Sequence, residues 1–168
     1  VPNGANYDVY FLSDDVIYSP KDSSSLFKGM KALTTVNTTN YRFSGVEKMQ
    51  EMFAECSALT TLDTTGWDTS KITDMTKLFY KCEVLQAVPG IGGWDMSNVE
   101  TMFAMFARAY KLKTLDVSNW NTGSVTSLYA MFQMCFDLEY LDVADWDVSK
   151  VTSFETMFKD PGQNSGAM

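Results

Sequence analysis

Residues 59–82 read LTTLDTTGWDTSKITDMTKLFYKC, and from Leu33 onward the chain repeats this pattern five times with a period of about 26 residues. A fixed period in this range is typical of proteins whose units stack side by side, because one short unit cannot bury its apolar stripe alone. The repeat therefore predicts a single elongated domain in which each unit covers the next.

Apolar residues recur in fixed columns of the repeat. The methionines, 11 in all, fall mostly in the second half of the units and are interpreted as flexible core filler. All four tryptophans occupy one column, which Tyr41 occupies in the first unit, so bulk is preserved there. We interpret this column as core that fills a turn, with a stacking platform for sugars as the alternative. The column consists of Tyr41, Trp67, Trp94, Trp120 and Trp146.

Each unit is predicted to contain a strand followed by a short helix. The opening Leu-x-x-Leu-Asp is short and rich in Thr, Val and Leu, which favours a strand. Ile72, Met75, Leu78 and Cys82 follow at spacings of three and four, which is typical of one helix face. Stacked units then give an α/β fold with a parallel sheet on one side and a row of helices on the other.

Short oxygen-bearing side chains precede each predicted helix. Asp68 and Ser70 are suited to turn and N-cap roles, because they satisfy free N–H groups of a first helical turn. Residues 97–100 match a capping box. The third unit carries one extra residue within 88–93, where proline and glycine predict a bulged loop.

Three regions are predicted within one domain. Residues 1–32 form an N-terminal cap with a partial repeat, 33–158 the five repeats, and 159–168 a polar tail. Residues 7–12 and 16–18 have the composition of β segments around a turn at 13–15.

Composition excludes several functions. A net charge of −8 argues against nucleic acid and anionic membrane surfaces as partners, since both need a basic patch. No apolar run approaches the ~20 residues of a membrane span, so no direct membrane insertion is expected. The chain has no histidine, which excludes imidazole-based triads, and no Gly-rich phosphate loop, so we expect neither enzymatic activity nor a cofactor. A hydrolase that uses a pair of carboxylates is the remote alternative, because Asp and Glu can do acid–base work.

The three cysteines, Cys56, Cys82 and Cys135, are predicted to be buried free thiols. Cys56 and Cys82 fall in the predicted helix column of neighbouring units, where helix axes about 8–10 Å apart would hold them too far apart for a disulfide.

The run Trp-Asp-x-Ser-x-Val-x-x-Met-x-x-Met-Phe, preceded by Leu-x-x-Leu-Asp, resembles the BspA-like leucine-rich-repeat surface proteins of bacteria, whose repeat also occurs in mycoplasma-type lipoproteins. The resemblance covers about residues 23–158. It implies a leucine-rich-repeat-like, right-handed α/β solenoid, an extracellular or cell-surface location, and adhesion to host proteins or other microbes. Two features depart from the family pattern: Pro89 stands where other units have Asp or Asn, and no capping unit is evident at the end.

The predicted strands have one outward face, which is the candidate binding surface. Strand alternation sends the residues on either side of the second Leu or Val outward. We expect this face to recognise an extracellular or host protein, with a glycan-binding module or a structural spacer as the alternatives. We also expect a monomer unless the last unit is left open. The candidate residues are Thr61, Asp63, Thr114, Asp116, Tyr140 and Asp142.

Two other interpretations of these residues stay open. The aspartates and threonines are also typical of soluble strands and of turns that bond to their own backbone. Asp116 and Asp142 lie one unit apart and are a candidate pair for a shared Ca²⁺, although such an ion takes six to eight oxygen ligands and no metal is expected here. Exposed aromatics such as Tyr110 and Tyr140 are the residues on which a glycan would stack.

Overall fold

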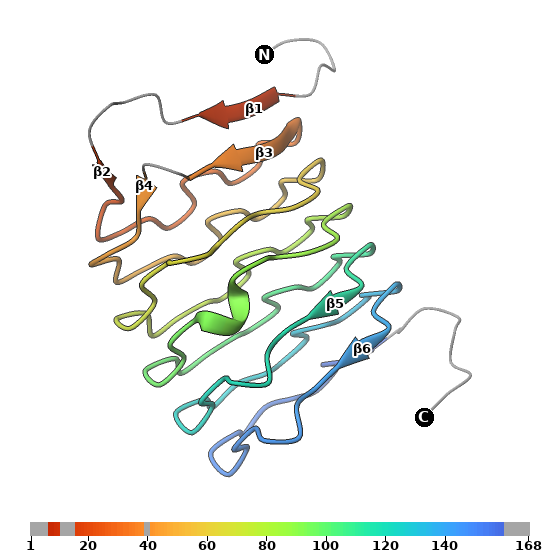
Figure 1. Cartoon of the computed structure of the whole chain (residues 1–168). Coiled ribbons are helices and arrows are strands. Elements are labelled where there is room, and N and C mark those ends of the chain that lie inside the picture. Colours follow the sequence, from red (N-terminus) through yellow and green to blue (C-terminus); the bar gives the residue numbers. More distant parts are fainter. Residues whose placement is uncertain (1–6, 11–15, 39–40, 160–168) are drawn as a thin grey trace.

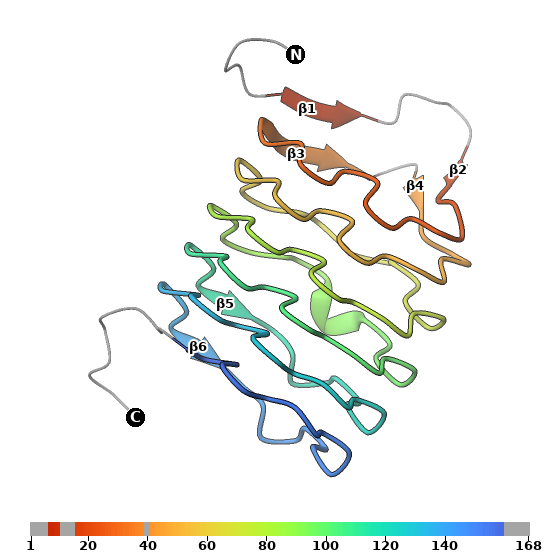
Figure 2. The ribbon, with the colours of Figure 1, turned by 180° about the vertical axis from the view of Figure 1, so that it is seen from behind.

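The structure is a computed structural model, and it describes residues 7–10 (backbone only), 16–38 and 41–159. The chain runs in successive passes that lie side by side, from β1 at one end to the segment after β6 at the other (Figure 1). The view from behind shows the same order (Figure 2). We call each pass of about 26 residues a rung.

The regular elements are few and short. The strands are β1 (Tyr7–Tyr10), β2 (Ile17–Tyr18), β3 (Leu33–Asn37), β4 (Tyr41–Arg42), β5 (Thr114–Leu115) and β6 (Tyr140–Leu141). They pair as three parallel two-stranded sheets, β1 with β3, β2 with β4, and β5 with β6. One 3₁₀ helix, η1 (Ile91–Gly93), lies in the insertion of the third unit. Other rungs meet through isolated parallel bridges, such as Thr61 with Ala87 and Thr101 with Ser127.

The predicted α/β class, with a leucine-rich-repeat-like right-handed solenoid of strands and helices, is wrong. The part of the chain that the structure describes contains no α-helix, and η1 is its one helical segment. In place of one continuous parallel sheet there are two-stranded sheets, and most of the backbone consists of turns and irregular segments.

Backbone hydrogen bonds explain why the predicted helices do not form. The N–H of Phe79 donates to the carbonyl of Met105 (2.9 Å), and the N–H of Lys81 donates to that of Ala107 (2.9 Å), both in the next rung. Alternate amides close tight turns, as when Cys82 N–H donates to the Phe79 carbonyl (3.1 Å). An α-helix needs bonds to the carbonyl four residues back. Linked turns therefore produce apolar spacings of three and four without a helix.

These turns hold non-glycine residues in the left-handed region, at two positions four residues apart. Lys77 (φ 54°) and Lys81 (φ 58°) form one such pair, and Ala104 (φ 51°) and Arg108 (φ 65°) form the next. Each costs about 1–2 kcal/mol relative to ordinary backbone. The cost is offset by the hydrogen bond that the same residue donates to the following rung, 2.8 Å long from Lys77 to Phe103.

A ladder of stacked phenylalanines shows that neighbouring rungs lie too close together for each to contain a helix. Neighbouring ring centroids lie 5.0–5.8 Å apart and the ring planes are within 15° of parallel. Packed helices need about 8–10 Å between axes. The ladder consists of Phe27, Phe53, Phe79, Phe106, Phe132 and Phe158.

The prediction that the tryptophan column is core is confirmed, because all four side chains are at least 92% buried and stack 5.9–6.4 Å apart. Tyr41 does not head the stack, however. Phe43 stacks on Trp67 at 3.6 Å, whereas Tyr41 meets Phe43 edge-on and donates its hydroxyl to Ser19 (3.1 Å). The first unit therefore fills the column with a residue two positions later than the alignment suggests.

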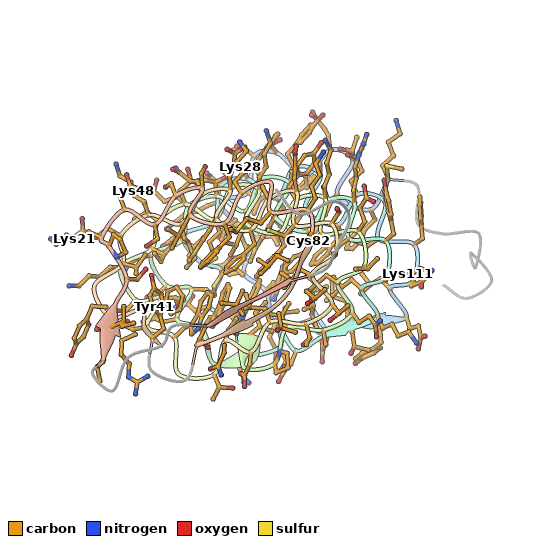
Figure 3. All side chains as sticks on the ribbon, turned by 90° about the horizontal axis from the view of Figure 1, so that it is seen from above. Lys21, Lys28, Tyr41, Lys48, Cys82 and Lys111 are labelled. Carbon is orange, nitrogen blue, oxygen red and sulfur yellow. The ribbon has the colours of Figure 1, made fainter. Side chains whose placement is uncertain are left out.

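The prediction of three buried free thiols is confirmed, although its reasoning is not. The column is not helical, so a wide helix spacing does not keep Cys56 and Cys82 apart. Each thiol instead donates to a carbonyl of the preceding rung, as Cys82 does to Phe53 (3.1 Å). Burial raises the pKa of Cys56 and Cys135 to about 12. Figure 3 shows Cys82 inside the stack, whereas Lys28 and Lys48 project from it.

The predicted cap chemistry is also corrected. Asp68 accepts from the backbone N–H of Ser70 (3.1 Å) and from its hydroxyl (2.6 Å), which is a turn that no helix follows. The expected capping box at 97–100 likewise lies in a turn. The strand expected at 7–12 is seen as β1, and the turn at 13–15 lies outside the described residues. The boundaries 1–32, 33–158 and 159–168 stay predictions.

Candidate functional site

The candidate site is the strand strip, which we define as Thr61, Asp63, Thr114, Asp116, Tyr140 and Asp142. All of them are exposed except Asp142, which is half-buried. Tyr140 is the most exposed large hydrophobic side chain in the described part of the molecule, at 67%.

A ladder of backbone hydrogen bonds joins the rungs along this strip. Gln86 N–H donates to the Thr60 carbonyl (2.9 Å), Lys113 N–H to that of Gln86 (3.4 Å), and Glu139 N–H to that of Lys113 (3.0 Å). Successive rungs are thereby held in register, so the outward side chains keep fixed spacings.

The strip brings some of the predicted residues together and separates others. Thr114 of β5 lies directly opposite Tyr140 of β6. Thr61 lies opposite Ala87 and is separated from Thr114 by that rung. The strip is therefore continuous over its last two rungs and is interrupted where the third unit supplies Ala87 and Pro89.

The aspartates of the strip bond to their own turns. Asp63 accepts from the N–H of Thr65 (2.9 Å), and Asp116 accepts from the Ser118 hydroxyl (2.8 Å). Asp142 accepts from the N–H of Ala144 (3.1 Å). One oxygen of each carboxylate therefore has the turn-forming role that is typical of aspartate. No group of three or more metal-binding side chains occurs in the described residues, so the Asp116–Asp142 pair gains no third ligand there.

Hydrogen bonds shift the pKa of the turn aspartates downward. The Thr65 hydroxyl and then its N–H lower the pKa of Asp63, and the Ser97 hydroxyl and N–H lower that of Asp95. Asp68 and Asp147 are lowered in the same way by Ser70 and Ser149. These four carboxylates are charged at neutral pH.

We predict a defined loss of stability in acid. The folded-state pKa of these aspartates lies below the ordinary value of 3.8, so their contribution is complete above that value and is lost as pH falls through the folded pKa. The triple variant Asp68→Asn, Asp95→Asn, Asp147→Asn should keep the turns, because Asn121 accepts from Gly123 N–H (3.2 Å) in the same position. As the pH falls below about 4, its unfolding free energy should fall less steeply than that of wild type in urea titrations. If the unfolding free energies of wild type and triple variant fell with pH at the same rate, the stabilising role of these carboxylates would be contradicted.

Two hollows adjoin the strip. Asp63 lines one of about 530 Å³, together with Arg42 and Trp67. The indole N–H of Trp67 is buried without a hydrogen-bond partner, unlike that of Trp120, which donates to the Ile91 carbonyl (3.0 Å). Tyr140 lines a second hollow of about 190 Å³ beside Phe158. Each end of the strip thus adjoins a hollow.

The sequence interpretation missed a second surface cluster, on the turn side of the rungs. Phe103 and Tyr129 stack at 5.3 Å, and they pack with Tyr80 against three buried alanines. Lys77 lies over the rings of both Tyr80 (5.6 Å) and Phe103 (5.8 Å). The signal was available in the sequence: the third and fourth units place Ala104 and Ala130 where the first two place Glu51 and Lys77.

The sequence of the chain matches the model of one known protein family. Residues 19–89 and 84–165 match the family described as Mycoplasma protein of unknown function, DUF285, and the chain belongs to that family. Comparisons with curated proteins and with solved structures give no match. Within the described residues, no helix has the length and apolar character needed to cross a membrane.

Proposed function

We propose that this chain is a non-enzymatic binding module of a bacterial cell surface, and that it recognises an extracellular or host protein through the strand strip. The observation that carries the proposal is the pair Thr114 and Tyr140. They are exposed, lie opposite each other on bonded rungs, and make no side-chain hydrogen bond within the described part of the chain. An ordered row of unengaged side chains is what an extended partner needs, and repeat proteins use such surfaces.

We further propose that the chain is one of the BspA-like surface proteins. This proposal rests on the repeated tryptophan, methionine and phenylalanine motif. It supports an extracellular location and an adhesive role. Treating intact cells with protease and then probing for the chain tests the location, because a cytoplasmic protein would be protected.

Binding is tested by screening immobilised extracellular proteins and a glycan array with the wild type and with the double variant Thr114→Lys, Tyr140→Ser. A protein ligand should bind the double variant at least about tenfold more weakly, as expected for the loss of an interface hot spot. Thr73→Lys is the matched control, because Thr73 is exposed but lies outside the strip.

The outcomes separate the alternatives. Selective binding to glycans, lost in the same variant, would replace the protein partner with a carbohydrate. Binding that the double variant and the control retain equally would move the site away from the strip. Absence of binding to every member of both panels would leave a spacer role.

A further inference from the structure

Some columns of apolar side chains that are buried in the interior rungs end in an exposed member at one end of the stack. Phe158 is 47% exposed, whereas Phe132, in the same column one rung earlier, is 2% exposed. The first rung precedes the first repeat unit, which begins at Leu33. Its Leu26 is 43% exposed, whereas Met52 in the second rung is fully buried. The exposed side chains therefore face the space that a further rung would fill.

The last rung also presents amide donors without acceptors. In the preceding rung, Leu128 N–H donates to the Ser153 carbonyl (2.7 Å) and Phe132 N–H donates to that of Met157 (2.9 Å). The hydroxyl of Thr156 is buried without a partner as well. The amides at the equivalent positions of the last rung, which have no acceptor in the described part of the chain, are those of Phe154, Thr156 and Phe158.

The first rung presents the opposite groups. In the second rung, the Gln50 carbonyl accepts from Ser25 N–H (2.9 Å) and the Met52 carbonyl accepts from Phe27 N–H (2.9 Å). The carbonyls at the equivalent positions of the first rung, which accept no hydrogen bond from the described residues, are those of Asp22, Ser24 and Leu26.

The two rows are therefore complementary to each other, and the row of donors on the last rung is not complementary to itself. Two last rungs facing each other would oppose donors to donors at 154, 156 and 158. A last rung against a first rung would pair these donors with the carbonyls at 22, 24 and 26, in the register that joins rungs inside the chain. Open edges of this kind are templates for pairing with another chain.

We propose that copies of this chain associate head to tail, with the last rung of one copy bonding to the first rung of the next. In this register Met157 of one copy lies over Leu26 of the other, because both occupy one column of the repeat, and Phe154 and Phe158 lie on the same face of the last rung. The interface is heterologous and leaves one free end of each kind on every assembly, so growth does not stop at a dimer. This inference goes beyond the proposed binding function, because it uses the ends of the stack and leaves the strand strip free.

Sedimentation of the 168-residue chain over a range of concentrations tests the proposal, at about 0.15 M and higher salt to screen the charge of −8. The weight-average mass should rise with concentration past twice the 18.9 kDa monomer. Phe158→Glu blocks the tail and Leu26→Glu blocks the head, so each variant alone should be monomeric. An equimolar mixture should form a one-to-one dimer, because one intact head and one intact tail remain.

Phe136→Glu is the control, since Phe136 is exposed (37%) and lies outside the set of end residues defined above. It should associate like the wild type, and circular dichroism should show that all three variants are folded. A wild type that stays monomeric overturns the proposal. A mass that levels off at a dimer, a mixture that remains monomeric, or equal loss of association in Phe136→Glu would overturn it too.

Discussion

Replacing Phe79 with alanine should lower the free energy of unfolding by about 3–5 kcal/mol, the largest effect that we expect from a side-chain truncation in this chain. Phe79 is fully buried and stacks between Phe53 (5.8 Å) and Phe106 (5.3 Å). Its loss leaves a cavity whose walls are held by hydrogen bonds to both neighbouring rungs, so the site has little freedom to collapse.

Phe158→Ala is the matched control for this prediction. Phe158 ends the same ladder and is 47% exposed, so its truncation should cost about 1–2 kcal/mol. Urea denaturation at low protein concentration measures both changes without contribution from association. Equal losses for the two variants would contradict the idea that stacking between rungs stabilises the core.

Gly90→Ala should be nearly as damaging, through the backbone. Gly90 has φ 83°, and a Cβ there would lie 2.4 Å from the Thr65 backbone nitrogen and 2.6 Å from its Cα. The left-handed conformation alone costs about 1–2 kcal/mol, and relieving the clash requires the loop that carries η1 to move away from the preceding rung. We expect a total loss above about 2 kcal/mol.

Two other glycines separate the causes. Gly66 has φ 78° with no atom near its missing Cβ, so Gly66→Ala should show the conformational cost alone. Gly93 has neither a positive φ nor a near neighbour, so Gly93→Ala should be almost neutral. The midpoint temperature of thermal unfolding should be lowest for Gly90→Ala, higher for Gly66→Ala and highest for Gly93→Ala. The reverse order for Gly90 and Gly66 would contradict the close contact with Thr65.

The repeat columns predict the core well, because burial depends on which residues recur and not on the backbone between them. Leu59, Phe79 and Trp94 are all buried as the columns indicate. The helix prediction failed because spacings of three and four are shared by helices and by linked turns. One signal against helices is in the sequence: Gly29 stands one period before Glu55, and both have positive φ (74° and 64°).

The candidate site is predictable in part. Alternation about Leu62 and Leu115 correctly places the neighbouring side chains outside. The hydrogen bonds of Asp63 and Asp116 to their own turns are among the alternatives that the sequence leaves open. The donors and acceptors at the end rungs depend on the direction of hydrogen bonds between rungs, which a mistaken helix assignment conceals.

The central claim is that rungs are joined directly by hydrogen bonds from linked turns, since both the strip and the complementary ends depend on it. The most direct measurement is the through-bond NMR coupling between amide nitrogens and hydrogen-bonded carbonyl carbons. A coupling from the Phe79 amide to the Met105 carbonyl, 26 residues ahead, is the predicted result. A coupling from Phe79 to the Met75 carbonyl, four residues back, would show a helix and contradict the account.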